Sequence, residues 1–156
     1  MLEVNSIYLY RNRKQVFKDF SLNLKNSEIV LLEGENGVGK TSLLNMISGL
    51  ISPDKGFIKI CTKSIIELGA QKKKVALTKL LFSKSKLWLL DEPLNGLDTK
   101  TITALKKIMV QHIRKNGSIL FSSHVKLNVK LTKRIILKKI TNKVNFDLLN
   151  KWENFK

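Results

Sequence analysis

The chain has 156 residues, of which 43% are apolar, so it is long enough for one domain with a hydrophobic core. Its 29 lysine and arginine residues outnumber its 12 aspartate and glutamate residues and give a net charge of +17. With one cysteine the chain cannot form an internal disulfide, and two histidines are too few for a usual zinc site. The sequence has no apolar run of 18 residues, so no membrane span is predicted.

The first half of the chain begins with strands and then forms a helix. Apolar runs predict strands over residues 2–9, 17–24 and 28–33, and the first of them leaves no room for a signal or transit peptide. Apolar residues on one face predict a helix over residues 40–50. After the turn "SPDKG", the run "FIKIC" predicts a short strand.

The second half alternates helices and strands, which predicts an α/β fold with a mainly parallel sheet flanked by helices. The first two or three strands are expected to form an antiparallel patch. We expect one domain over residues 1–140 and a tail over 141–156. The expected elements are a helix over 71–83, a buried strand over 86–90, a helix over 99–115, the strands "SILFSS" and "RIILKK", and a loosely docked helix in the tail.

The motif "GENGVGKT" follows an apolar strand and precedes a helix, which is the context of a phosphate-binding loop. Its glycines allow backbone N–H groups to surround phosphate oxygens. Lys40 is expected to reach the β and γ phosphates of ATP, and Thr41 to bind Mg²⁺ through its hydroxyl. The expected nucleotide contacts are Gly34, Glu35, Asn36, Gly37, Val38, Gly39, Lys40, Thr41 and Ser42.

The motif "LWLLDEP" is a buried strand that delivers two carboxylates to its C-terminal end, where ligands of α/β proteins bind. Asp91 is expected to hold Mg²⁺ through water, and Glu92 to act as general base on the attacking water. Such a sequence alone is often only a turn, but about fifty residues after a phosphate loop it indicates catalysis.

Together with "LNGLD" and "SSH", these motifs resemble the ATP-binding subunit of an ABC transporter from Leu2 to about Lys138. The resemblance implies that Asp98 ends the D-loop and that His124 contacts the γ-phosphate and the attacking water. The catalytic residues expected are Glu92, His124 and Lys40, and the metal ligands are Thr41 and Asp91. Two copies are expected to form a homodimer across ATP.

Within this family, "EGENGVGKTSLL", "LWLLDEP" and "SSHVKLNVKLTKRIIL" resemble the haem-exporter ATPase of cytochrome c maturation system I. That branch implies a peripheral subunit on an integral membrane permease, tied to haem delivery for c-type cytochromes. The location implied is the inner face of a membrane, in bacteria or in the mitochondrial matrix. Neither histidine is assigned as a haem ligand.

The chain departs from the family between the phosphate loop and the signature motif, where only about residues 52–68 are available. This length cannot hold the family's helical subdomain, and no glutamine is left for its glutamine loop. In the signature motif, expected at residues 67–71 ("ELGAQ"), Leu68 replaces a serine that would donate a hydrogen bond to the opposite subunit's γ-phosphate. Gly69 and Gln71 remain expected ATP contacts.

Other contacts are less defined by the sequence. Glu35 replaces a usual proline and is expected to face solvent. Either Tyr8 or Tyr10 lies near the family's adenine-stacking position, and Tyr10 is favoured, although a strand tyrosine is more often simply packed.

Three functions remain open: a reduced transporter ATPase, a nucleotide-binding but catalytically silent subunit of the same complex, and an ABC-type ATPase acting on nucleic acid or ribosomes. The last is the weakest, because the cations are mostly scattered lysines. With many isoleucines and asparagines, they fit a genome rich in A and T, and no specific nucleic-acid partner is expected. This codon bias slightly favours an organelle-encoded protein.

Overall fold

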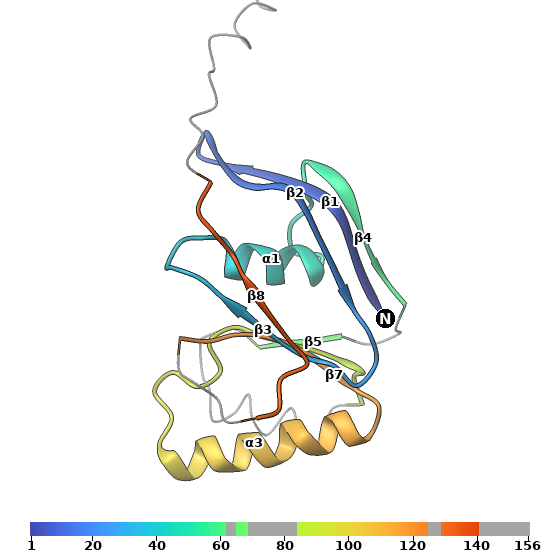
Figure 1. Cartoon of the computed structure of the whole chain (residues 1–156), viewed down its shortest axis with the longest axis vertical. Helices are drawn as coiled ribbons and strands as arrows, with labels where there is room; N and C mark the ends of the chain where they lie inside the picture. The colour runs from blue at the N-terminus through green and yellow to red at the C-terminus, as the bar shows by residue number, and fades with distance from the viewer. Residues whose placement is uncertain (62–64, 69–83, 125–128, 141–156) are drawn as a thin grey trace, which may run out of the picture.

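The structure is a computed structural model that describes residues 1–61, 65–68, 84–124 and 129–140. Within these ranges the chain forms two β-sheets and two helices (Figure 1). For residues 65–68 the structure describes the backbone. The helix expected over 71–83 and the tail 141–156 lie outside the described residues.

The smaller sheet is antiparallel, with strand order β2-β1-β4, and it confirms the expected antiparallel patch. Its strands are β1 (Leu2–Arg11), β2 (Lys14–Leu24) and β4 (Lys55–Ile60). Alternate residues of β1 are buried, among them Leu2 and Val4, so one face of this sheet covers the core and the other faces solvent.

The larger sheet is parallel throughout, with strand order β5-β6-β7-β3-β8. It confirms the predicted α/β class. The central strands β6 and β7 are buried along their whole length, which explains their continuous apolar sequences. The strands are β3 (Ile29–Glu33), β5 (Ile65–Leu68), β6 (Leu87–Leu90), β7 (Ser118–Ser122) and β8 (Lys133–Ile136).

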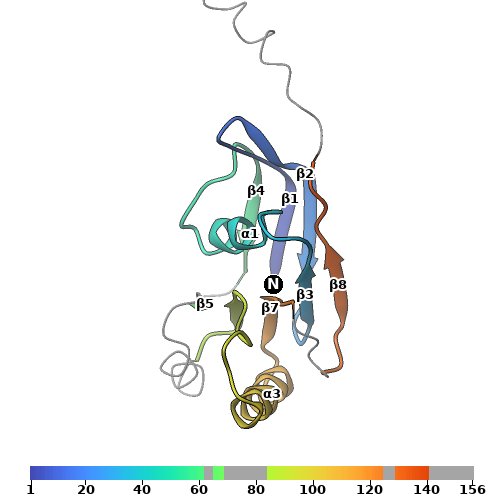
Figure 2. The ribbon, with the colours of Figure 1, turned by 90° about the vertical axis from the view of Figure 1, so that its left-hand side faces the viewer.

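One helix packs on each face of the parallel sheet (Figures 1 and 2). Helix α1 (Lys40–Ile47) lies between the two sheets and shares a core with Leu32 and Leu89. Helix α3 (Thr99–Arg114) packs through Leu105 and Met109 on the other face of the sheet. There it contacts the side chains of β3 and β6 that point away from α1. The alternation of side chains along β3, β6 and β7 therefore supplies both cores.

Two expectations about the elements need correction. The helix expected to reach Leu50 ends at Ile47, because Gly49 adopts a positive φ of 82° and Leu50 is 70% exposed, away from the core. No strand was predicted over residues 65–68, but strand β5 forms there, and Glu67 and Leu68, the first two residues of the expected signature motif, pair with Leu89 and Leu90 of β6. Four residues show too little periodicity to predict a strand, and the neighbouring strand β6 supplies their backbone partners.

Candidate functional site

The loop between β3 and α1 holds the phosphate-binding motif at the C-terminal edge of the parallel sheet. Gly34 and Gly39 have φ values of 146° and 111°, and Gly39 is the N-cap of α1. A Cβ atom on Gly39 would stand 2.6 Å from Val16 Cγ1, and one on Gly34 would stand 2.6 Å from the Leu137 carbonyl oxygen. Both positions therefore require glycine, for backbone conformation and for space.

Lys40 begins helix α1 and is nearly buried, with 7% of its surface exposed. Its Nζ donates hydrogen bonds to the carbonyl oxygens of Gly34 (2.7 Å) and Glu35 (3.0 Å) and lies 3.2 Å from His124 Nε2. The ammonium group is thus held inside the loop by neutral acceptors. A cation in this setting is well placed to bind an anion that enters the loop.

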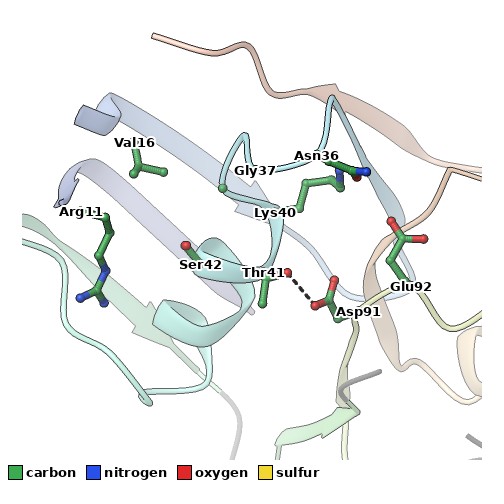
Figure 3. Close-up of a pocket in the computed structure, with 10 residues that line it drawn as sticks. Arg11, Val16, Asn36, Gly37, Lys40, Thr41, Ser42, Asp91 and Glu92 are labelled. Atoms are coloured by element: carbon green, nitrogen blue, oxygen red, sulfur yellow. Dashed lines mark hydrogen bonds between the residues drawn. The ribbon is translucent and has the colours of Figure 1, made fainter. Parts of the chain in front are cut away.

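Thr41 and Asp91 meet although fifty residues separate them in the sequence. Thr41 Oγ1 donates a hydrogen bond of 2.7 Å to Asp91 Oδ2 (Figure 3). These two oxygens fit Mg²⁺, which takes one or two protein oxygens and keeps several water ligands. No group of three or more His, Cys, Asp or Glu side chains suited to a metal occurs among the described residues.

Glu92 and His124 form the second half of the same edge. Glu92 Oε1 lies 3.3 Å from His124 Nε2, and Glu92 Oε2 accepts a hydrogen bond of 3.4 Å from the His124 backbone N–H. Glu92 Oε1 is buried and accepts no hydrogen bond from the described part of the chain. A carboxylate oxygen in this state can take a proton from a nearby water.

The phosphate loop, Asp91 and Glu92 line a cavity of about 450 Å³ (Figure 3), and His124 is not among its lining residues. Asp91 and Glu92 stand at one side of the phosphate loop, and Arg11 and Val16 stand at the other. The predicted residues that the cavity brings together are Asn36, Gly37, Gly39, Lys40, Thr41, Ser42, Asp91 and Glu92.

Other predicted residues lie elsewhere. The side chain of Val38 is buried in the core, and Glu35 is exposed, as expected. Tyr10 is not among the residues that line the cavity, and its hydroxyl accepts a hydrogen bond from Gln15 Nε2. The Asp98 carboxylate caps helix α3 by accepting a hydrogen bond of 2.7 Å from the Thr101 N–H.

Gly69 and Gln71 lie outside the described residues. Three residues at or beside the cavity were not among the predicted site residues: Arg11 and Val16 line the cavity, and Ser122 contacts Asp91 and Glu92. Arg11 immediately follows Tyr10, and Ser122 is the first residue of the motif "SSH". Their nearness to expected site residues was therefore the only sequence signal that could have pointed to them.

Residues 17–67 match the ABC transporter family. The chain is 27% identical to a "cytochrome c biogenesis ATP-binding export protein CcmA" of Reclinomonas americana, over 91% of this chain and 92% of that protein. It is 24% identical to the protein of the same name from Escherichia coli O157:H7, over 85% and 93%. The first alignment spans 206 positions, more than the 156 residues of this chain, so that relative carries residues without a counterpart here.

The fold is also found in solved structures. A putative metal-chelate type ABC transporter matches with a TM-score of 0.71 and 19% identity, over 88% of this chain and 80% of that chain. An ATP-binding subunit of an ABC transporter matches with a TM-score of 0.69 and 21% identity, over 98% and 93%. In the part of the chain that the structure describes, no helix has the length and apolar character needed to cross a membrane. The chain therefore has the fold of an ABC ATPase cassette and resembles the ATP-binding subunits of ABC transporters, among them the CcmA proteins.

Proposed function

We propose that the chain binds and hydrolyses ATP as the peripheral subunit of an ABC transporter complex that serves cytochrome c biogenesis through haem export or delivery. The observation that carries this proposal is the meeting of Lys40, Thr41, Asp91, Glu92 and His124 at one edge of the parallel sheet. The names of its relatives support the transport role.

The proposed mechanism assigns each side chain a separate task. Backbone N–H groups of the phosphate loop bind the phosphates of ATP, and Lys40 exchanges the carbonyl oxygens of Gly34 and Glu35 for γ-phosphate oxygens. Mg²⁺, held by Thr41 and Asp91, supplies charge neutralisation on the phosphates when bound.

Glu92 Oε1 then takes the proton of the water that attacks the γ-phosphate, and this oxygen is already buried with no hydrogen-bond donor from the described residues. His124 Nε2 lies 3.2 Å from Lys40 Nζ and 3.3 Å from Glu92 Oε1. It is therefore placed to keep the base and the γ-phosphate in line.

The proposed partners follow from the same relatives. We assign an integral membrane permease as the docking partner and a second copy of the chain as the partner across ATP. The ATPase domain then comprises residues 1–140, with 141–156 as a tail. The complex lies on the inner face of a membrane, either bacterial or mitochondrial.

A second candidate is a subunit that binds ATP but does not hydrolyse it. One observation that favours it is the alignment with the Reclinomonas protein, which contains residues that have no counterpart in this chain. It is also favoured by Leu68, which supplies no side-chain donor where the family has serine. The two candidates differ in turnover and share nucleotide binding.

Replacing Glu92 by glutamine separates them. In the chain purified with its membrane partner, we expect slow phosphate release that Glu92→Gln lowers by at least about 100-fold, because an amide cannot accept the proton. Binding of Mg-ATP should persist, because Lys40 and Thr41 are intact. Glu33→Gln is the matched control, since Glu33 pairs with Arg134 and does not line the cavity. Mg-ATP binding without any Glu92-dependent turnover would establish the silent subunit instead.

A further inference from the structure

We propose that Ser122 is a positioning residue that holds Asp91 and Glu92 in their working arrangement. This inference rests on the proposed function, because it concerns the same two carboxylates. Ser122 lies at the C-terminal end of β7 and is completely buried. It is not among the residues that line the cavity.

The Ser122 hydroxyl joins two consecutive residues of the neighbouring strand end. Its Oγ donates a hydrogen bond of 2.7 Å to Asp91 Oδ1 and accepts one of 2.9 Å from the Glu92 backbone N–H. The directions of both bonds follow from the groups involved, because a carboxylate accepts and an amide N–H donates. One hydroxyl therefore satisfies both partners.

The bond to Asp91 orients its carboxylate. With Oδ1 occupied by Ser122, the other oxygen, Oδ2, faces Thr41 and accepts the 2.7 Å hydrogen bond from Thr41 Oγ1. A carboxylate held at both oxygens has one orientation rather than several. Groups that stand behind a metal ligand in this way commonly change metal affinity by about 10- to 100-fold when they are removed.

The bond to Glu92 supports an unfavourable backbone conformation. Glu92 has a φ of 47°, in the left-handed region, which is strained for a residue other than glycine. The hydrogen bond from its N–H to Ser122 helps to hold the chain in this turn, which directs the Glu92 side chain toward His124. The register of β6 and β7 explains this contact. Leu90 pairs with Phe121, so the residues that follow them, Asp91 and Ser122, lie side by side.

The strand contains a matched control for this role. Ser118, at the other end of β7, is also completely buried, and its Oγ donates a hydrogen bond of 2.7 Å to the Lys25 carbonyl oxygen. Ser118→Ala and Ser122→Ala each remove one buried hydroxyl from the same strand. A purely structural role predicts similar effects of the two changes.

The test measures binding of a fluorescent ATP analogue by the full chain as Mg²⁺ is titrated, together with thermal unfolding and ATP turnover. We expect Ser122→Ala to raise the Mg²⁺ concentration for half-maximal binding by about 10-fold and to lower kcat, while binding in EDTA is unchanged. Ser118→Ala should leave the Mg²⁺ requirement and kcat at their wild-type values, although it lowers the unfolding temperature.

Equal Mg²⁺ requirements for Ser122→Ala and Ser118→Ala would overturn the inference. If Ser122→Ala does not fold, Ser122→Cys takes its place, because a thiol of similar size is only a weak donor; a wild-type Mg²⁺ requirement for this variant would also overturn it. A wild-type chain without turnover would refute hydrolysis, but the Mg²⁺ titration would still decide the role of Ser122.

Discussion

At the scale of single residues, the proposed function places the phosphates and the adenine base of ATP at opposite ends of the cavity. Glu92 and Lys40 stand where the γ-phosphate is proposed to bind. The adenine base of the nucleotide should therefore point toward Arg11 and Val16 on the other side of the loop (Figure 3). Tyr10, the sequence-based choice for the base, is bonded to Gln15 through its hydroxyl. An arginine can contact a base by stacking its planar guanidinium on the ring.

We therefore predict that Arg11 contributes more to nucleotide affinity than Tyr10. Arg11→Ala should weaken ATP binding by about 2- to 5-fold, as expected for an exposed stacked cation. Arg11→Lys should weaken it similarly, because an ammonium keeps the charge without the planar surface. Titration calorimetry of both variants and of Tyr10→Ala measures this. A larger loss in Tyr10→Ala than in Arg11→Ala would restore Tyr10 as the base contact.

Much of the site was predictable at this scale, since Lys40, Thr41, Asp91 and Glu92 lie in motifs with a recognisable local context. Arg11 and Ser122 were not. Their importance depends on which strand end lies opposite which loop, and local sequence patterns do not contain that information.

At the scale of elements, an aromatic contact joins helix α3 to the parallel sheet in addition to the apolar contacts of Leu105 and Met109. The His112 ring stacks on Trp88 of β6, with ring centroids 3.7 Å apart and an interplanar angle of 13°. Gly117 follows the helix, and a Cβ atom there would collide with the His112 ring. The His112 Nε2 and Trp88 Nε1 atoms have no hydrogen-bond partner among the described residues.

This contact predicts a loss of stability at acidic pH. Burial lowers the pKa of His112 below 6.5 and outweighs backbone hydrogen bonds with Ser118 and Lys86, which raise it. The unfolded chain therefore binds a proton more readily than the folded chain below about pH 6.5. Stability from the neutral ring is fully present above that pH and is lost as the pH falls toward the lowered value, by at most about 1.4 kcal/mol per pH unit.

Urea unfolding at pH 7.5 and at pH 5.5 measures this effect in the wild type and in His112→Gln. The variant should be less stable at pH 7.5, because it loses the stacked ring, but its stability should depend less on pH. His124→Gln is the control, since the His124 side chain is 45% exposed. The prediction fails if the wild type and His112→Gln lose equal stability between the two pH values.

Sequence periodicity predicted α3 almost completely, because a 16-residue helix repeats its apolar stripe several times. It failed for β5, because four residues define no period and no strand was predicted there. The strand forms because β6 offers unpaired backbone groups at the sheet edge, which is a tertiary cause.

At the scale of the whole molecule, the net charge of +17 raises the question of whether the protein associates with membranes through charge or through a partner. A layer of lysines on anionic lipid is screened by salt, with a Debye length of about 3 Å at 1 M ionic strength. A docked subunit is held by packed contacts and resists salt.

We predict that the chain stays on membranes in a 1 M salt wash and co-purifies with an integral membrane protein after detergent extraction. Mass spectrometry of the extracted complex identifies the partner. As a control, a soluble protein of similar net charge should be released by the same wash. Complete release of the chain at high salt, or its recovery with RNA alone, would contradict the proposed partner.

The fold class could be predicted from the sequence, and so could the positions of the phosphate loop and the two carboxylates, because these depend on local pattern and on the order of strands and helices. That Ile65–Leu68 completes the parallel sheet, that Arg11 lines the cavity, and that Ser122 links Asp91 to Glu92 became clear from the three-dimensional fold. Each of these depends on strand register and on which strands lie side by side, and long-range packing sets both.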